Sequence, residues 1–186
     1  MEARLEAAVR KVVDFLTAHG YRYAIIGGIA LSQWGIVRAT FDADIKVLVP
    51  NYDYATARAE LRAAFPQPAR PEGPENPLIV DVLVEGVTVD LLLALPGYEE
   101  LIIQRAIQRD LGGWSVQICS AEDLIIQKVV AGREKDWLDV EALLVARRDS
   151  LDQDYIKHWL GEFAEALEDR EFVLRYDHLL GRVTKG

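Results

Sequence analysis

The stretch from residue 25 to residue 49, IIGGIALSQWGIVRATFDADIKVLV, most constrains what this chain can fold into. An apolar run ends at the pair Gly27-Gly28, and a short helical pattern follows it. A strand that turns into a helix at such a pair exposes backbone N–H groups, to which phosphate oxygens bind well. A side chain at either glycine would block that approach. The pair therefore indicates a phosphate-binding turn, and a purely structural turn is the alternative.

Two aspartates, Asp42 and Asp44, open the second apolar run of this stretch. Successive strand side chains point to opposite faces, so the two carboxylates share a face about 7 Å apart along the chain. Like charges held that close repel each other unless a cation lies between them. Mg²⁺ prefers carboxylate and phosphate oxygens. The stretch therefore predicts a metal–nucleoside triphosphate site. The alternative is a turn in which Asp42 only caps the strand entry.

Composition excludes several other classes of protein. The net charge of −9 argues against a large non-specific nucleic-acid footprint, and Arg58, Arg62 and Arg70 are too dispersed to form one. Cys119 is the only cysteine, which excludes an intramolecular disulfide and a cysteine-based zinc site. The charged N-terminus lacks the apolar segment of a signal peptide. No apolar run approaches the roughly 20 residues that span a bilayer. We therefore expect a cytoplasmic protein without a membrane partner.

The hydrophobic pattern predicts an α+β fold, in which helices pack on a small mixed β-sheet and a helical cluster follows at the C-terminus. Ser120 and Asp123 are typical of a helix start. The region of residues 66–77 is rich in proline and is expected to form a loop. We divide the chain into a core of residues 1–119 and a helical region of residues 120–186. Strands are expected at 21–26, 41–49, 78–84, 87–93 and 114–119, and helices at 2–18, 27–34, 51–65, 98–109, 120–131, 135–147 and across 151–180.

A third carboxylate, Asp90, lies in the apolar run of residues 87–93. Burying a lone carboxylate is costly, so Asp90 needs a partner. If its strand neighbours that of Asp42 and Asp44, three acids meet at one metal site, and Asp90 can also accept the proton of an attacking hydroxyl. Asp81, in the run LIVDVLV, is a rival for this role. A carboxylate that is merely satisfied at a strand end is the structural alternative.

Several segments together resemble the nucleotidyltransferase superfamily, which has the DNA polymerase beta-like fold. They are GG at 27–28, RAT at 38–40, DAD at 42–44, VDLL at 89–92 and the later segment AEDLIIQKVVAGREKDWLDVEALL. Within the superfamily, the chain is most similar to AbiEii-type and related small bacterial proteins. The resemblance implies the nucleotidyltransferase fold and Mg²⁺ held by Asp42, Asp44 and Asp90, and it favours Asp90 over Asp81. The superfamily often has Ser where this chain has Gly28, which removes one hydroxyl contact.

The resemblance also implies further nucleotide-binding residues beside Gly27 and Gly28. The counterpart of Lys128 points at the nucleotide phosphates, where a cation would offset the triphosphate charge. A lysine that extends its charge to solvent is the alternative. Asp136 is included among the nucleotide-binding residues. Either Asp136 or Asp139 is expected to position Lys128 or Arg133. The alternative is that each is an exposed charge on its helix. Arg38 is expected to reach phosphate or to neutralise the nearby acids.

The sequence thus favours an enzyme that transfers a nucleoside monophosphate from a Mg²⁺-bound nucleoside triphosphate to an acceptor hydroxyl, with release of pyrophosphate. The acceptor is left open among a small molecule, a protein and a tRNA. The predicted function includes a role in a toxin–antitoxin-like system, with an antitoxin protein as partner. The alternative is a non-catalytic nucleotide-binding or protein-interaction module of the same fold. A dinucleotide-binding domain is disfavoured, because no G-x-G-x-x-G follows the first strand.

Overall fold

A computed structural model describes residues 2–70 and 76–185. The chain forms two compact units, each held together by its own contacts. The first consists of Met1–Ala30 and Arg38–Cys119, and the second of Leu31–Val37 and Ser120–Gly186. The first unit contains α1 (Ala3–Ala18), β1 (Arg22–Ile26), the start of α2 (Gly27–Gln33), β2 (Asp42–Leu48), a 3-10 turn (Pro50–Tyr52), α3 (Tyr54–Ala64), β3 (Ile79–Val84), β4 (Val87–Leu93), α4 (Tyr98–Gln104), β5 (Ile107–Asp110) and β6 (Ser115–Ile118).

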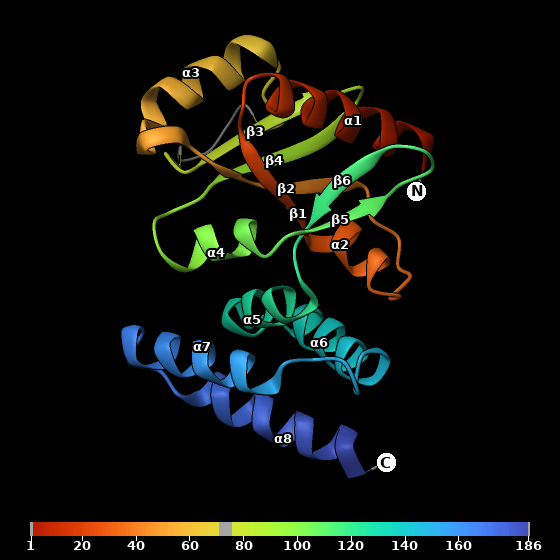
Figure 1. Ribbon diagram of the computed structural model, residues 1–186, viewed down its shortest axis with the longest axis vertical. Helices are drawn as coiled ribbons and strands as arrows, with labels where there is room; N and C mark the ends of the chain where they lie inside the picture. The colour runs from red at the N-terminus through yellow and green to blue at the C-terminus, as the bar shows by residue number, and fades with distance from the viewer. Residues whose placement is uncertain (1, 71–75, 186) are drawn as a thin grey trace. The chain divides into compact units, whose positions relative to one another are not determined.

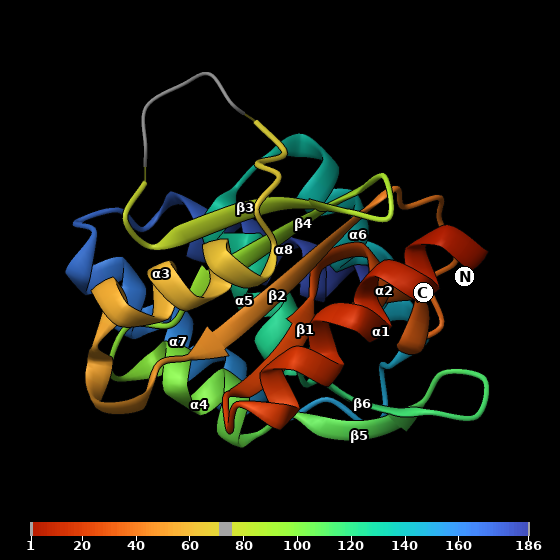
Figure 2. The same cartoon turned by 90° about the horizontal axis from the view of Figure 1, so that it is seen from above.

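A six-stranded mixed sheet in the order β3-β4-β2-β1-β6-β5 forms the centre of the first unit (Figure 1, Figure 2). β2 runs antiparallel to β1 and parallel to β4, while β3 runs antiparallel to β4. β3 and β4 form a hairpin that turns at Glu85-Gly86, where both residues have positive φ. The mixed sheet with helices packed on it confirms the predicted α+β class.

The two faces of the sheet differ in chemistry. α1 and α3 lie over one face (Figure 1), where Ala43, Ile45 and Val47 of β2 are buried beside the apolar residues of β4. Each aliphatic side chain buried there stabilises the fold by about 1.5–3 kcal/mol. Because strand side chains alternate, the residues between them point to the other face. That face therefore carries Asp42 and Asp44.

One predicted element is wrong. The sequence predicted a helix across residues 98–109, but α4 ends at Gln104 and Ile107–Asp110 forms strand β5. β5 pairs antiparallel with β6, and Gly112 and Gly113 take up positive φ in the turn between them. The pairing satisfies the backbone N–H and C=O groups of this short segment and overrides the helix propensity of its Gln and Arg residues. A local hydrophobic pattern does not reveal this stabilisation of β5 by its pairing with β6.

The second unit contains the end of α2 and four helices: α5 (Ala121–Ala131), α6 (Glu134–Ala146), α7 (Gln153–Ala166) and α8 (Glu171–Lys185). Ser120 caps α5 as predicted: its hydroxyl accepts the Asp123 N–H at 3.0 Å and donates to the Asp123 carboxylate at 2.7 Å. The helical stretch predicted across 151–180 is two helices, separated near Glu168, which has positive φ. In the described parts of the chain, no helix combines the length and apolar character needed to cross a membrane.

Candidate active site

Three acids stand side by side across neighbouring strands on the polar face of the sheet. In the parallel pair β2–β4, Asp44 lies opposite Asp90, and in the antiparallel pair β3–β4, Asp81 lies opposite Asp90. Residues opposite each other point to the same face and are about 4.8 Å apart. The sequence left open whether the strand of Asp90 neighbours that of Asp42 and Asp44, and the structure places the two strands together. Asp81, the rival, belongs to the same row.

Asp42 extends this row along β2. It lies opposite Thr88 of β4 and accepts a hydrogen bond from the Thr40 hydroxyl at 3.2 Å. Asp42 and Asp44 are separated by the buried residue Ala43, as the alternation of a strand requires. The polar face thus carries four carboxylates on three neighbouring strands, which we call the acid row: Asp42, Asp44, Asp81 and Asp90.

The glycine pair packs against this acid row. Gly27 has a φ of +63°, and a Cβ added to it would lie 2.1 Å from Oδ2 of Asp44. A Cβ added to Gly28 would lie 2.3 Å from the Thr40 hydroxyl. The sequence interpretation kept these positions open for phosphate. In the structure, side chains that flank and form the acid row take up that space, so glycine is required there for packing as well as for backbone conformation.

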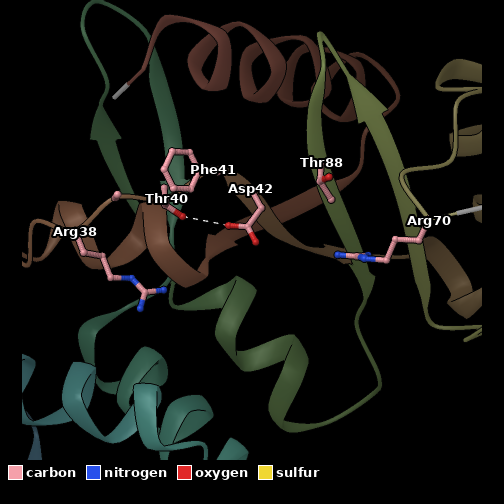
Figure 3. Close-up of a pocket in the computed structure, with 7 residues that line it drawn as sticks. Arg38, Thr40, Phe41, Asp42, Arg70 and Thr88 are labelled. Atoms are coloured by element: carbon pink, nitrogen blue, oxygen red, sulfur yellow. Dashed lines mark hydrogen bonds between the residues drawn. The ribbon is translucent and has the colours of Figure 1, made fainter.

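A pocket of about 320 Å³ opens beside the acid row (Figure 3). Its lining combines cations, hydroxyls and an aromatic ring from three segments of the first unit: Arg38, Ala39, Thr40, Phe41, Asp42, Arg70 and Thr88. Phe41 is 75% exposed although it directly precedes Asp42. Arg38, which the sequence assigned to phosphate or to the acids, therefore lies at this pocket. The volume falls at the low end of ligand sites, about 300–1,000 Å³.

Arg70 enters the acid row from outside the sheet. Its guanidinium donates to both oxygens of Asp90, at 2.8 and 2.9 Å, and its backbone N–H donates to Asp81 at 2.7 Å. These hydrogen bonds to Asp90 raise the pKa of Arg70, and the charges of Asp90, Asp81 and Asp42 add to the effect against the opposing effect of burial. Sequence reasoning missed this role, because Arg70 stands in a proline-rich segment without periodicity.

Backbone pairing holds Arg70 in place. The Leu83 N–H donates to the carbonyl of Gln67 at 2.8 Å, and Pro68 forms a bridge with Val82. Residues 67–69 therefore run along the outer edge of β3, which both covers an edge strand and delivers Arg70 to the row. Residues 71–75 of the loop predicted at 66–77 lie outside the described residues.

Lys46 is a second cation that the sequence analysis overlooked. It follows Asp44 by two positions, so it points to the same face of β2, and it is buried. Its ammonium contacts Glu99 of α4, whose second oxygen accepts the Leu95 N–H at 2.7 Å. A buried ammonium needs such a partner, because desolvation of an unpaired charge is costly. The face that carries the acids therefore also holds a buried ammonium whose charge is balanced by Glu99.

The carboxylates fit a hard divalent cation in their chemistry. Asp42, Asp44 and Asp90 offer oxygen ligands from adjacent strand positions on one face, as Mg²⁺ requires. Their present side-chain arrangement is different: within residues 2–70 and 76–185, no three His, Cys, Asp or Glu side chains are gathered to hold a metal ion. Arg70 binds both oxygens of Asp90 instead.

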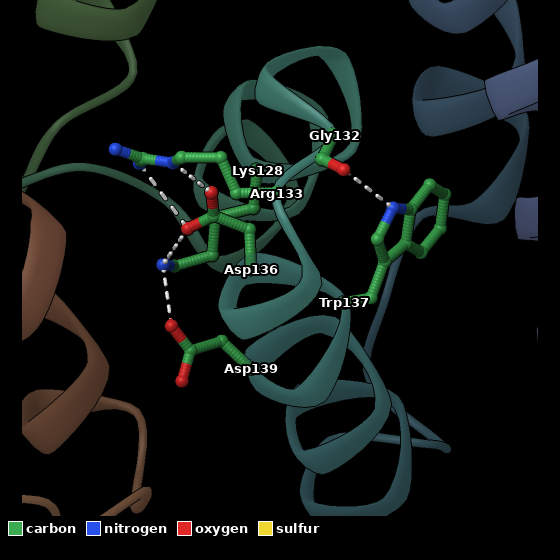
Figure 4. A network of polar contacts seen from close by, with 6 residues as sticks. All are labelled: Lys128, Gly132, Arg133, Asp136, Trp137 and Asp139. Carbon is green, nitrogen blue, oxygen red and sulfur yellow. Dashed lines mark hydrogen bonds and ion pairs between the residues drawn. The ribbon is translucent and has the colours of Figure 1, made fainter.

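Lys128 is the centre of a buried ion-pair network in the second unit (Figure 4). Its ammonium lies 3.1 Å from Asp136 and 2.6 Å from Asp139, and only 7% of the residue is exposed. Burial raises the pKa of Asp136, but hydrogen bonds from Arg133 and Lys128 outweigh it and hold that pKa below its usual value. The alternatives of a solvent-exposed lysine and of exposed helix carboxylates are therefore wrong. Asp136 contacts both Lys128 and Arg133.

Comparison with known proteins supplies the family. The profile of the family described as nucleotidyl transferase of unknown function (DUF2204) matches residues 5–175. No curated protein matches the sequence significantly.

Solved structures share the fold. The solution structure of the antibiotic-resistance factor ANT(2'')-Ia superposes with a TM-score of 0.62 at 17% identity, covering 90% of this chain and 97% of that one. ANT(2'')-Ia in complex with adenylyl-2''-tobramycin gives a TM-score of 0.57 at 16% identity, with 86% and 96% covered. An antigenic nucleotidyltransferase-like protein from Paracoccidioides brasiliensis gives 0.57 at 17% identity, with 93% and 92% covered. The predicted nucleotidyltransferase fold is thereby confirmed.

The contact between Gly27 and Asp44 leads to a first prediction. Gly27→Ala should lower the free energy of unfolding by more than the roughly 1–2 kcal/mol that a left-handed backbone costs an alanine, because its Cβ overlaps the Asp44 carboxylate. Gly20→Ala is the matched control, since Gly20 also has positive φ but nothing lies within 4 Å of an added Cβ. Urea unfolding measures both. In an Asp44→Ala background the extra cost should largely disappear, and an undiminished cost there would contradict the contact.

The network around Lys128 leads to a second prediction. Lys128→Met should lower the free energy of unfolding by about 3–5 kcal/mol, because it removes the buried ammonium that Asp136 and Asp139 share. Adding Asp136→Asn and Asp139→Asn to this variant should recover most of the loss. Lys157→Met, on the exposed face of α7, is the control and should stay within about 0.5 kcal/mol of the wild type. Thermal and urea unfolding measure all three, and a Lys128→Met protein of wild-type stability would disprove the structural role.

Proposed function

The chain belongs to the family of nucleotidyl transferases of unknown function, and from this premise we propose that it transfers a nucleoside monophosphate from a Mg²⁺-bound nucleoside triphosphate to an acceptor hydroxyl. The observation that carries the proposal is the register of β2 and β4, which sets Asp44 opposite Asp90. Asp42 lies two residues before Asp44 on β2 and points to the same face. Three carboxylates on adjacent positions of one face have no purpose in packing, since their mutual repulsion costs stability.

Each residue of the site has a role in this reaction. Asp42, Asp44 and Asp90 would hold the metal, which when bound stabilises the charge on the triphosphate oxygens. The acceptor oxygen attacks the α-phosphorus, the bond to the β-phosphate oxygen breaks, and pyrophosphate leaves. Asp90 accepts the proton of the attacking hydroxyl. Positioning and charge neutralisation account for most of the rate enhancement in such a transfer.

The pocket beside the acid row suits the phosphates. Arg38 brings a guanidinium and Thr40 and Thr88 bring hydroxyls to its lining. Such donors bind phosphate oxygens through charge-assisted and neutral hydrogen bonds. Gly27 and Gly28 let the Asp44 carboxylate and the Thr40 hydroxyl pack against the adjacent turn, and we propose that its backbone contributes to nucleotide binding beside them.

We propose a small hydroxylated molecule as the acceptor. The net charge of −9 opposes the approach of a polyanion such as tRNA. ANT(2'')-Ia, a protein of the same fold, has been solved with adenylyl-2''-tobramycin, which is a nucleotidylated small molecule. A protein acceptor and a tRNA acceptor are the outcomes against which this choice is tested.

A non-catalytic module is the second candidate, and one observation favours it. Arg70 neutralises Asp90 through two hydrogen bonds, so that the third acid is engaged by the protein itself. A module of this kind would bind nucleotide or a partner protein without turnover. The two candidates differ in whether label passes from nucleotide to acceptor.

We propose four finer assignments as well. They are membership of the AbiEii-type subgroup, a toxin–antitoxin-like role with an antitoxin partner, a cytoplasmic location, and a division of the chain into a nucleotidyltransferase core of residues 1–119 and a C-terminal helical region of residues 120–186. Within the second unit, we further propose that Lys128 and Asp136 contribute to nucleotide binding. The ion pair between them gives the ammonium a defined position, as a phosphate-binding lysine requires.

Transfer of label tests the proposed reaction. We expect the wild type, incubated with Mg²⁺ and each α-labelled nucleoside triphosphate, to label a member of an aminoglycoside pool in preference to pools of tRNA or protein. Asp42→Ala/Asp44→Ala should lower transfer at least about a hundredfold, the scale seen when charge stabilisation at a reacting centre is lost. Absence of transfer together with absence of Mg²⁺-dependent nucleotide binding by the wild type would overturn the enzyme. Transfer that survives the double substitution would show that the site lies elsewhere.

The role of Asp90 is tested separately. Asp90→Asn should retain binding of the Mg²⁺–nucleotide within about threefold, because the amide keeps one oxygen for the metal. It should lose at least about a hundredfold in turnover, because the amide cannot accept the proton of the acceptor. Equilibrium binding and single-turnover transfer measure the two quantities. An equal loss of binding and turnover would make Asp90 a metal ligand without the role of base.

A further inference from the structure

The contact between Arg70 and Asp90 also bears on how the site binds a nucleotide. We propose that Arg70 is a nucleotide-binding residue, whose guanidinium leaves Asp90 for a phosphate of the nucleotide when metal and nucleotide bind. This inference rests on the proposed function, because it takes the ligand to be a metal-bound triphosphate.

The geometry of the present contact matches that ligand. The guanidinium presents two parallel N–H groups to the two oxygens of Asp90, at 2.8 and 2.9 Å. The same planar fork fits two oxygens of a phosphate equally well. Arg70 also lines the pocket together with Asp42 and Thr88, and Figure 3 shows it extending toward Asp42 from the opposite wall. A phosphate in this pocket therefore lies within the range of the same side chain.

The anchor of Arg70 allows the exchange without a change in the backbone. Its N–H is fixed on Asp81, and residues 67–69 pair along the edge of β3. The side chain itself is 55% exposed, so that rotation about its bonds meets little packing resistance. The backbone stays over the acid row while the charged end changes partner.

Charge makes the exchange necessary. A cation bound by Asp42, Asp44 and Asp90 needs an oxygen of Asp90 that the guanidinium now engages. Two positive groups at one carboxylate repel each other. The triphosphate brings negative charge to the same pocket, so Arg70 loses one anionic partner and gains another. Arg70 and Asp90 then each have an oppositely charged partner in both states, which removes the cost of leaving either one uncompensated.

A fixed structural ion pair makes a different prediction. If Arg70 only neutralises Asp90, its removal frees a carboxylate for metal and leaves nucleotide affinity unchanged or improved. If Arg70 changes partner, its removal helps the metal alone but harms the nucleotide. The two effects have opposite signs, which separates a nucleotide-binding residue from a merely structural one.

The experiment compares full-length wild type, Arg70→Ala and Arg70→Lys, with Arg4→Ala on the exposed face of α1 as the matched control. Mn²⁺ alone is the metal probe, followed by the electron paramagnetic resonance of the free ion. The α,β-methylene analogues of the four ribonucleoside triphosphates, with Mn²⁺ present, are the nucleotide probes, followed by calorimetry. Thermal unfolding confirms that each variant is folded.

We expect Arg70→Ala to bind Mn²⁺ alone about threefold to fivefold more tightly than the wild type, as loss of a partly exposed ion pair allows. It should bind the nucleotide analogue about tenfold or more weakly, because a charged hydrogen-bonding pair to phosphate is gone. Arg70→Lys should lie between the two in nucleotide affinity, since it keeps the charge without the fork. Arg4→Ala should match the wild type in both.

Unchanged or improved nucleotide affinity in Arg70→Ala, with a wild type that binds the analogue, would overturn this inference and leave the proposed function intact. Weaker binding of both probes would overturn it as well, because it would make Arg70 a support of the acid row. A wild type that binds none of the analogues would overturn the proposed function, and this inference with it.

Discussion

The parallel pairing of β2 with β4 is the constraint on which the rest of the site depends. It brings residues that are far apart in the chain, Asp44 and Asp90, to neighbouring positions on one face. A shift of the register by one residue would turn Asp90 into the apolar side under α1 and α3 and break the site. The alternation of buried residues along both strands prevents that shift, because the apolar face can be buried in one register only.

This arrangement concentrates like charge on one face of the sheet, and two charged groups of that face are paired with opposite charges. Arg70 reaches Asp90 from the covered edge of β3, and Lys46 lies on the same face of β2 beside Glu99 of α4. The second unit follows the same rule inside its own core, where Lys128 holds Asp136 and Asp139. In each case a buried or half-buried charge is retained because its partner makes the burial tolerable.

The sequence supported some parts of the site much better than others. The spacing of Asp42 and Asp44 sufficed to place them on one face, since strand alternation is a local property. The cap at Ser120 was equally local and was confirmed. The helix expected through residue 109 was wrong, because β5 exists only through its pairing with β6. Arg70 was missed for the same reason: its partner is 20 positions away, and no periodic pattern joins them.

By itself, the sequence determined the α+β class, the apolar and polar faces of the strands, and the shared face of Asp42 and Asp44, because side-chain period and residue chemistry follow directly from the order of residues in the chain. Only the tertiary structure decided that Asp81 joins the row, that Gly27 makes room for Asp44, and that a guanidinium sits on Asp90. These features arise from strand order and register across the sheet. Strand order and register depend on how the whole unit packs, so they cannot be read from any local stretch of residues.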